Sequence, residues 1–250
     1  MEKIVENAII ARDVWNDLAN EQEWGKIAKY FHLRPTMEGI TIVSTLPTMP
    51  MRGIKVKTKA KLKEKLKEIN SSFKQLAGND VKSREASRIR LGFKETTPKK
   101  QRNPGYFIEE DRQAMMINSM NSDLNLPKIL GIDNIKFITS ELILNGTSGR
   151  IDIVGYAEPY LYFFELKKDR TTKVDQLSEY IKSYSEKITL LSNLLANYPI
   201  NPVHQPEGIK IKGVMVMRHA ENSNVDWKEM ANKHKIDILF YRTSLSYTRV

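Results

Sequence analysis

Five short apolar segments in the second half of the chain constrain its fold more than any other feature. They are rich in β-branched and aromatic residues, which is typical of β-strands. Three follow one another directly, and the last two alternate with segments that have the period of an amphipathic helix. This order predicts an α/β fold with a mixed central sheet flanked by helices. The predicted strands are 137–144, 149–156, 160–166, 209–217 and 236–241, and the helices between them are 174–195 and 225–234.

The first half of the chain carries helical and strand patterns in a different order, which predicts an α+β domain. Its second helix should end at Pro35, because proline disfavours a helical conformation in the residue before it. A weak similarity to a helix-turn-helix spans residues 23–40. The predicted elements are helices over 4–15, 24–35 and 62–76, a strand over 39–46 and a loop over 47–53.

The excess positive charge of the chain lies entirely in its first 104 residues. The net charge is +10, with 22 Lys and Arg against 12 Asp and Glu up to Pro104 and 18 against 18 beyond it. The polar stretch 96–105 contains two prolines, which predicts a domain boundary. We therefore expect a basic nucleic-acid-binding domain at 1–104 and a second domain at 105–250. A solvated, lysine-rich surface is the alternative explanation of the charge.

Seven lysines occupy every second position from Lys55 to Lys67. In a strand they would share one face, whereas in a helix they would spread around the axis. We expect a strand or loop that passes into a helix near Lys61. Phosphate contacts are predicted for Lys55, Lys57, Lys59 and Lys61, with a solvated face as the alternative.

Several classes of protein are excluded by composition. The chain has no cysteine, which excludes disulfides, thiolate metal sites and thiol nucleophiles. No apolar run approaches the 18 residues of a membrane-spanning helix. The first residues lack the basic flank and apolar stretch of a secretory signal, so we expect a cytoplasmic protein that does not enter a membrane.

Charged residues interrupt two adjacent apolar strands in the second half. Glu165 and Lys167 are two residues apart and should share one face of their strand. The stretch 157–160 predicts a hairpin turn, so the preceding strand should pair antiparallel and bring Asp152 beside them.

Two carboxylates at such a place require a cation, because burying an unpaired charge costs several kcal/mol. Oxygen ligands without cysteine or convergent histidine favour Mg²⁺, for which Mn²⁺ can substitute. Together with Lys167, such a metal forms a site for phosphodiester hydrolysis. A hairpin with exposed charges is the alternative, but Glu165 lies in the strongly apolar stretch 162–166.

These residues resemble the PD-(D/E)xK nuclease superfamily. The match consists of Asp152 with Glu165-Leu166-Lys167, and Ile151 replaces the proline of the superfamily's name. Gln176 and Tyr180 are similar to the Gln-x-x-x-Tyr helix of the branch that contains RecB-type nuclease domains and NucS-like mismatch endonucleases. The resemblance covers about residues 108–242 and implies a restriction-endonuclease-like core.

The resemblance also implies roles for individual residues. Asp152, Glu165 and the Leu166 carbonyl would ligate the metal, Lys167 would position the attacking water, and Gln176 would orient the site. Further acidic positions of the branch match Glu141 in the preceding strand and Glu110 in the preceding helix, where Glu109 competes for the role. Candidates for contact with the nucleic acid are Arg150, Lys168, Arg170 and Tyr180.

The sequence therefore predicts a Mg²⁺-dependent DNA endonuclease of restriction-like or structure-specific type. One such core carries one active site, so a double-strand cut would require a homodimer. A nucleic-acid-binding module with a degenerate nuclease fold, or a nuclease directed at RNA, are the alternatives.

Overall fold

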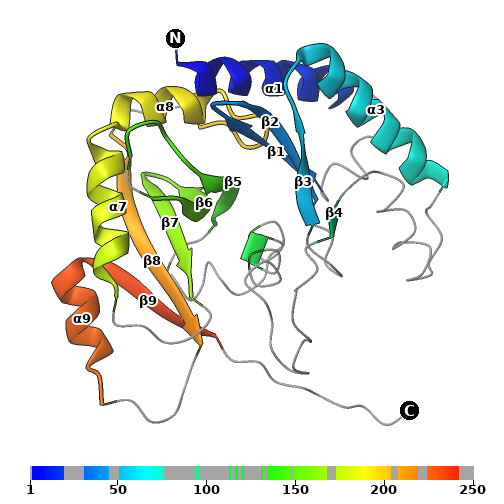
Figure 1. Ribbon diagram of the computed structural model, residues 1–250. Helices are drawn as coiled ribbons and strands as arrows, with labels where there is room; N and C mark the ends of the chain where they lie inside the picture. Colours follow the sequence, from blue (N-terminus) through cyan, green and yellow to red (C-terminus); the bar gives the residue numbers. More distant parts are fainter. Residues whose placement is uncertain are drawn as a thin grey trace, which may run out of the picture.

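Two separate β-sheets and their covering helices make up the computed structural model (Figure 1). It is an α/β architecture, as the sequence predicts. The structure describes residues 2–19, 31–44, 51–75, 94–95, 113, 116–117, 120, 131, 134–147, 149–167, 173–203, 208–218 and 224–241.

The larger sheet has the strand order β5-β6-β7-β8-β9 and forms the C-terminal unit together with helices α7, α8 and α9. The first three strands form an antiparallel meander, and β8 and β9 then add in parallel. Helices occupy the two parallel connections, as such connections require. The strands are β5 (Lys136–Leu142), β6 (Ile151–Ala157), β7 (Tyr160–Leu166), β8 (Lys210–Arg218) and β9 (Ile236–Tyr241), and the helices are α7 (Asp175–Ser185), α8 (Ile188–Ala196) and α9 (Trp227–His234).

Both faces of this sheet are buried, which explains why its strands are almost continuously apolar. On one face, Val154, Phe163 and Met215 pack against Leu177 of α7 and Leu191 of α8. The opposite face packs against residues that precede β5 in the sequence. The residues in contact there include Ile153, Phe164, Val214, Ile117 and Met120.

The N-terminal unit is a second sheet with the order β1-β2-β3-β4, covered by two helices that pack against each other. Its neighbouring strands all pair antiparallel. Apolar residues of both helices meet those of β1 and β2 in a separate core. The elements are α1 (Lys3–Ala19), β1 (Phe31–Thr36), β2 (Gly39–Ser44), β3 (Met51–Val56), α3 (Lys59–Gln75) and β4 (Lys94–Glu95).

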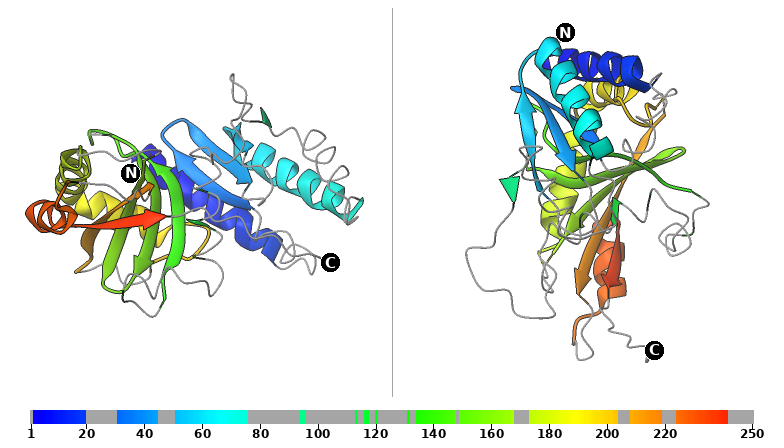
Figure 2. Two further views of the ribbon diagram at one scale, coloured as in Figure 1. Left: turned by 90° about the horizontal axis from the view of Figure 1, so that it is seen from below. Right: turned by 90° about the vertical axis from the view of Figure 1, so that its right-hand side faces the viewer.

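Helix α1 lies against both units (Figure 2), and its two halves belong to different cores. Ile4, Val5 and Ala8 pack into the core of the C-terminal unit. The second half of the helix, including Val14 and Leu18, packs into the core of the N-terminal unit. Strand β1 also contacts β5 directly, so the units share a second area of contact.

Several predicted elements are confirmed, and three are wrong in part. The helix expected over 24–35 is wrong from Phe31 onward, because Phe31–Thr36 is strand β1, and this also removes the helix-turn-helix interpretation there. Pro35 is tolerated because β1 lies at the edge of its sheet. Residues Met51–Gly53 belong to β3 rather than to a loop.

The third correction concerns the long helix expected over 174–195. It is divided into α7 and α8, with a turn at Glu186 and Lys187. Apolar residues keep a helical spacing on both sides of the turn because both helices pack on one core. The predicted boundary stretch 96–105 lies outside the described residues, so the division at residue 104 stays a prediction. Within the described part of the chain, none of the helices could span a membrane.

Candidate active site

Strands β6 and β7 place the two predicted metal-binding carboxylates side by side. Ile153 pairs with Phe164, so the next position of the same antiparallel register sets Asp152 opposite Glu165. Each residue is only 6% exposed. The sequence predicts this pairing from the hairpin turn at 157–160, and the strand register of the structure agrees with the prediction.

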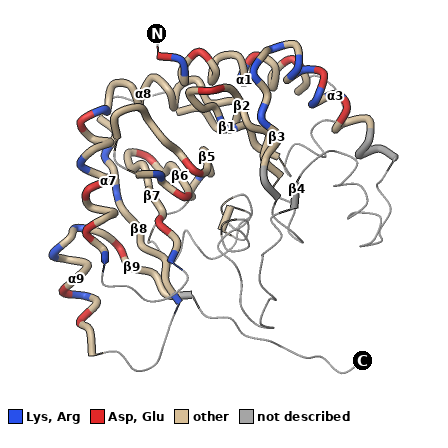
Figure 3. Tube along the Cα trace, in the orientation of Figure 1, with Lys and Arg blue, Asp and Glu red and all other residues tan. Residues whose placement is uncertain are grey.

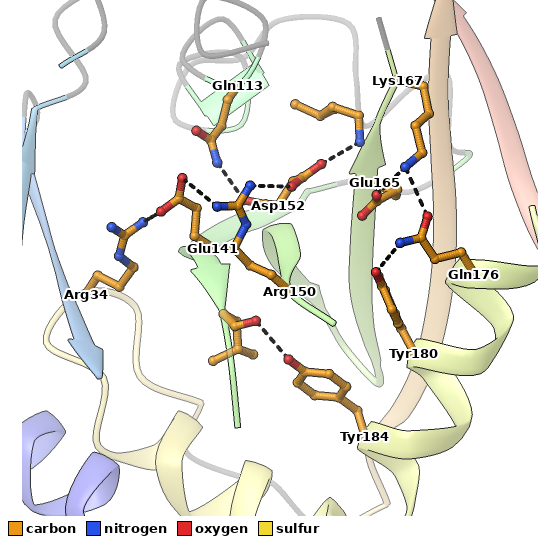
Figure 4. A network of polar contacts seen from close by, with 12 residues as sticks. Arg34, Gln113, Glu141, Arg150, Asp152, Glu165, Lys167, Gln176, Tyr180 and Tyr184 are labelled. Carbon is orange, nitrogen blue, oxygen red and sulfur yellow. Dashed lines mark hydrogen bonds and ion pairs between the residues drawn. The ribbon is translucent and has the colours of Figure 1, made fainter. Parts of the chain in front are cut away.

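The Asp152 carboxylate is oriented by the neighbouring strand. The backbone N–H of Leu166 donates a hydrogen bond to Asp152 Oδ2 over 2.8 Å, and Arg150 Nη2 lies 3.9 Å from Oδ1. Gln113, which precedes β5 in the sequence, donates a hydrogen bond of 2.8 Å from its Nε2 to the Asp152 carbonyl oxygen. These contacts fix both the backbone and the side chain of Asp152 (Figure 4).

Lys167 links the second carboxylate to helix α7. Its Nζ donates to Glu165 Oε1 over 2.7 Å and to Gln176 Oε1 over 3.3 Å. Gln176 in turn donates from Nε2 to the hydroxyl of Tyr180, one helical turn further along α7. The lysine ammonium is therefore held between a strand and a helix, with its position set from both sides.

The close approach of α7 depends on two glycines. Gly149 has φ +74°, and a Cβ there would overlap the ring of Tyr180. Gly213 of β8 lies under α7, where a Cβ would come within 2.6 Å of Ile181 Cδ1. Glycine at these positions lets the helix lie against the sheet with Gln176 beside the carboxylates.

A third carboxylate, Glu141, continues the row on strand β5. Ser140 pairs with Ile153 and Leu142 with Ile151, so Glu141 lies opposite Asp152. Arg150 Nη1 is 3.6 Å from Glu141 Oε1, and Arg34 of the N-terminal unit forms a hydrogen-bonded ion pair with Oε2. Ion pairs thus lead from Arg34 through Glu141 and Arg150 to Asp152 (Figure 4).

The donor atoms of this site fit a hard divalent cation. Asp152 and Glu165 provide carboxylate oxygens in a setting where two negative charges would otherwise repel. Among the described residues, no three His, Asp or Glu side chains come together as a metal site. The expected set contains two side chains and the Leu166 carbonyl, and metal binding by all three stays a prediction.

Other predicted residues lie elsewhere or outside the described part of the chain. Lys55 lies in strand β3 of the N-terminal unit, one residue before its end, and forms an ion pair with Glu38. Lys57 is exposed just before α3, and Lys59 and Lys61 are exposed in its first turn, which holds no acidic residue. Glu64 and Glu68 follow further along the helix, among its other lysines (Figure 3). The candidates outside the described residues are Glu110, its competitor Glu109, Lys168 and Arg170.

Sequence reasoning missed Arg34 and Gln113. Arg34 is 107 residues away from its partner Glu141, and Gln113 is 39 residues away from Asp152. Neither residue belongs to a local motif, because their roles arise only when separate parts of the chain pack together.

Comparison with known proteins finds no match to this chain among protein-family models, curated proteins or solved structures.

Proposed function

We propose that this protein is a Mg²⁺-dependent DNA endonuclease of the PD-(D/E)xK superfamily, in the RecB- and NucS-like branch, with a restriction-endonuclease-like C-terminal core. The observation that carries the proposal is the grouping of Asp152, Glu165, Lys167 and Gln176 at one end of the five-stranded sheet. A binding module would have no need to bury two carboxylates with an ordered lysine.

The side chains suggest how hydrolysis would proceed. Bound Mg²⁺ would supply positive charge to the scissile phosphate and make a bound water more acidic. Lys167, held by Glu165 and Gln176, would keep its ammonium directed at the attacking water. Arg150, whose side chain is 48% exposed, would contact a phosphate oxygen.

The exposed lysines of β3 and α3 support DNA as the partner, because they add positive charge that attracts any phosphate backbone. A chain with one such site cuts one strand, so we propose a homodimer for double-strand cleavage.

Nicking of supercoiled plasmid DNA tests the proposal. Wild type should cut in Mg²⁺ and stop in EDTA, and Asp152→Asn should be inactive. Glu158→Gln is the matched control, because Glu158 is an exposed acid in the turn at the other end of the same hairpin. Cleavage in EDTA, or activity of Asp152→Asn equal to that of the control, would contradict the proposal. Cleavage of RNA but not DNA would replace DNA with RNA as the substrate.

A further inference from the structure

Strand β1 of the N-terminal unit presents alternate side chains to the two units. Phe31 and Leu33 point into the core of the N-terminal unit. His32 lies in contact with β5, where its Nε2 is 2.9 Å from Ser140 Oγ and its ring packs edge-on against Phe137. Arg34 is two residues further along, so the strand directs it to the same side.

Arg34 reaches the next residue of β5 after Ser140, which is Glu141. The backbone of Glu141 has φ +50°, a left-handed conformation that is unfavourable for a residue other than glycine. Such strain persists only where the surroundings hold it. The ion pair with Arg34 is one contact that holds the Glu141 side chain in place.

The two carboxylate oxygens of Glu141 form ion pairs with two arginines that come from different units. Oε2 accepts from Arg34, and Oε1 lies 3.6 Å from Arg150 Nη1. Arg150 also lies 3.9 Å from Asp152. The chain of contacts therefore runs from the N-terminal unit to one of the proposed metal ligands.

The two arginines differ in how far their side chains are exposed to solvent. The side chain of Arg34 is 16% exposed, that of Glu141 31% and that of Arg150 48%. Arg150 is accessible to a phosphate, whereas Arg34 lies behind the carboxylate. Arg34 would thus act through Glu141 and not by touching the nucleic acid.

We infer that Arg34 is a positioning residue of the active site, supplied by the N-terminal unit, which holds Glu141 so that Glu141 orients Arg150 beside Asp152. The inference rests on the proposed nuclease function and extends it, because it makes the N-terminal unit part of the catalytic arrangement in addition to its role in binding DNA.

Single-turnover cleavage with saturating enzyme tests this inference, combined with DNA affinity measured in Ca²⁺. Arg34→Met should lower the cleavage rate about 10- to 100-fold, the usual effect of removing a residue that supports an active-site group. Affinity should change less than threefold. Arg34→Lys should recover part of the rate, because it keeps the charge and loses the fork geometry.

Two further variants separate positioning from a structural role. Glu141→Gln should slow cleavage to a similar degree, and the double variant with Arg34→Met should be no slower than either one. Arg12→Ala is the matched control, because Arg12 Nη1 donates to Asn197 Oδ1 over 2.6 Å and also joins α1 to the C-terminal unit. It should lower the melting temperature and leave the cleavage rate of the folded enzyme unchanged.

The outcomes distinguish this inference from the function on which it rests. If wild type cuts and Arg34→Met cuts at the same rate, the assignment of Arg34 is wrong and the nuclease remains. The assignment would also be overturned if the rate losses of Arg34→Met and Glu141→Gln multiplied in the double variant, or if Arg12→Ala slowed cleavage as much as Arg34→Met does. If wild type does not cut any nucleic acid in Mg²⁺ or Mn²⁺, the proposed function itself fails.

Discussion

Acid should weaken the fold through His32, at the contact between the two units. His32 is 2% exposed on β1, with its Nε2 2.9 Å from Ser140 Oγ of β5. Burial lowers the pKa of His32 from 6.5 to about 3, and the nearby Arg34 adds to the effect by repulsion. The folded protein therefore keeps this imidazole neutral at pH values where the unfolded chain protonates it.

The sign and size of the effect follow from proton linkage. Between pH 6.5 and pH 3 the unfolded chain binds one more proton at this residue, so the free energy of unfolding falls as the pH falls. Each pH unit in this window corresponds to about 1.4 kcal/mol. Lowering the pH from 7 to 5 should therefore remove about 2 kcal/mol, and the stabilisation is fully present only above pH 6.5.

Urea unfolding at pH 7 and pH 5 measures this loss. His32→Gln retains an amide that can bond to Ser140 and does not titrate, so its stability should change about 2 kcal/mol less than that of wild type between the two pH values. Equal losses in wild type and His32→Gln would refute the described packing of β1 on β5.

Three further substitutions test the site and the basic surface. Lys167→Ala should abolish cleavage and change DNA affinity less than a few-fold, because Lys167 acts in the chemical step, and single-turnover rates with binding assays measure both; a collapse of affinity would make it a phosphate-binding residue instead. Gly149→Ala should lower both the melting temperature and the cleavage rate. Gly146→Ala should lower only the melting temperature, because Gly146 has the same φ of +74° but a Cβ there would meet its nearest atom at 3.4 Å. Equal effects of the two substitutions would exclude a special role for the packing of Tyr180 on Gly149. Changing Lys55, Lys57, Lys59 and Lys61 together to glutamine should reduce the salt dependence of DNA binding. The slope of log affinity against log salt concentration should fall by about 0.9 for each phosphate that is no longer neutralised, and an unchanged slope in a salt titration would indicate a solvated face.

The C-terminal sheet could be predicted well from the sequence, because each of its strands has its own apolar signal. The strands 160–166 and 236–241 have the bounds that the pattern predicts. The hairpin between β6 and β7 also fixed the position of Asp152 relative to Glu165, since a short turn leaves little freedom in register.

Strand β1 and the partners of the site could not be predicted in the same way. Phe31 continues a helical spacing from residue 24, and the alternation of Phe31, Leu33 and Pro35 is too short to outweigh it. The roles of Arg34 and Gln113 depend on contacts between distant segments, which no local period encodes.

Mn²⁺ binding, followed by the electron paramagnetic resonance signal of the free ion, tests whether Asp152 and Glu165 bind a metal, and it does not depend on the choice of nucleic acid. Wild type and Glu158→Gln should bind Mn²⁺ with the same affinity, Mg²⁺ should compete for the site, and Asp152→Asn and Glu165→Gln should each abolish the binding. Equal Mn²⁺ affinity in all four proteins would contradict the assignment of Asp152 and Glu165 as metal ligands.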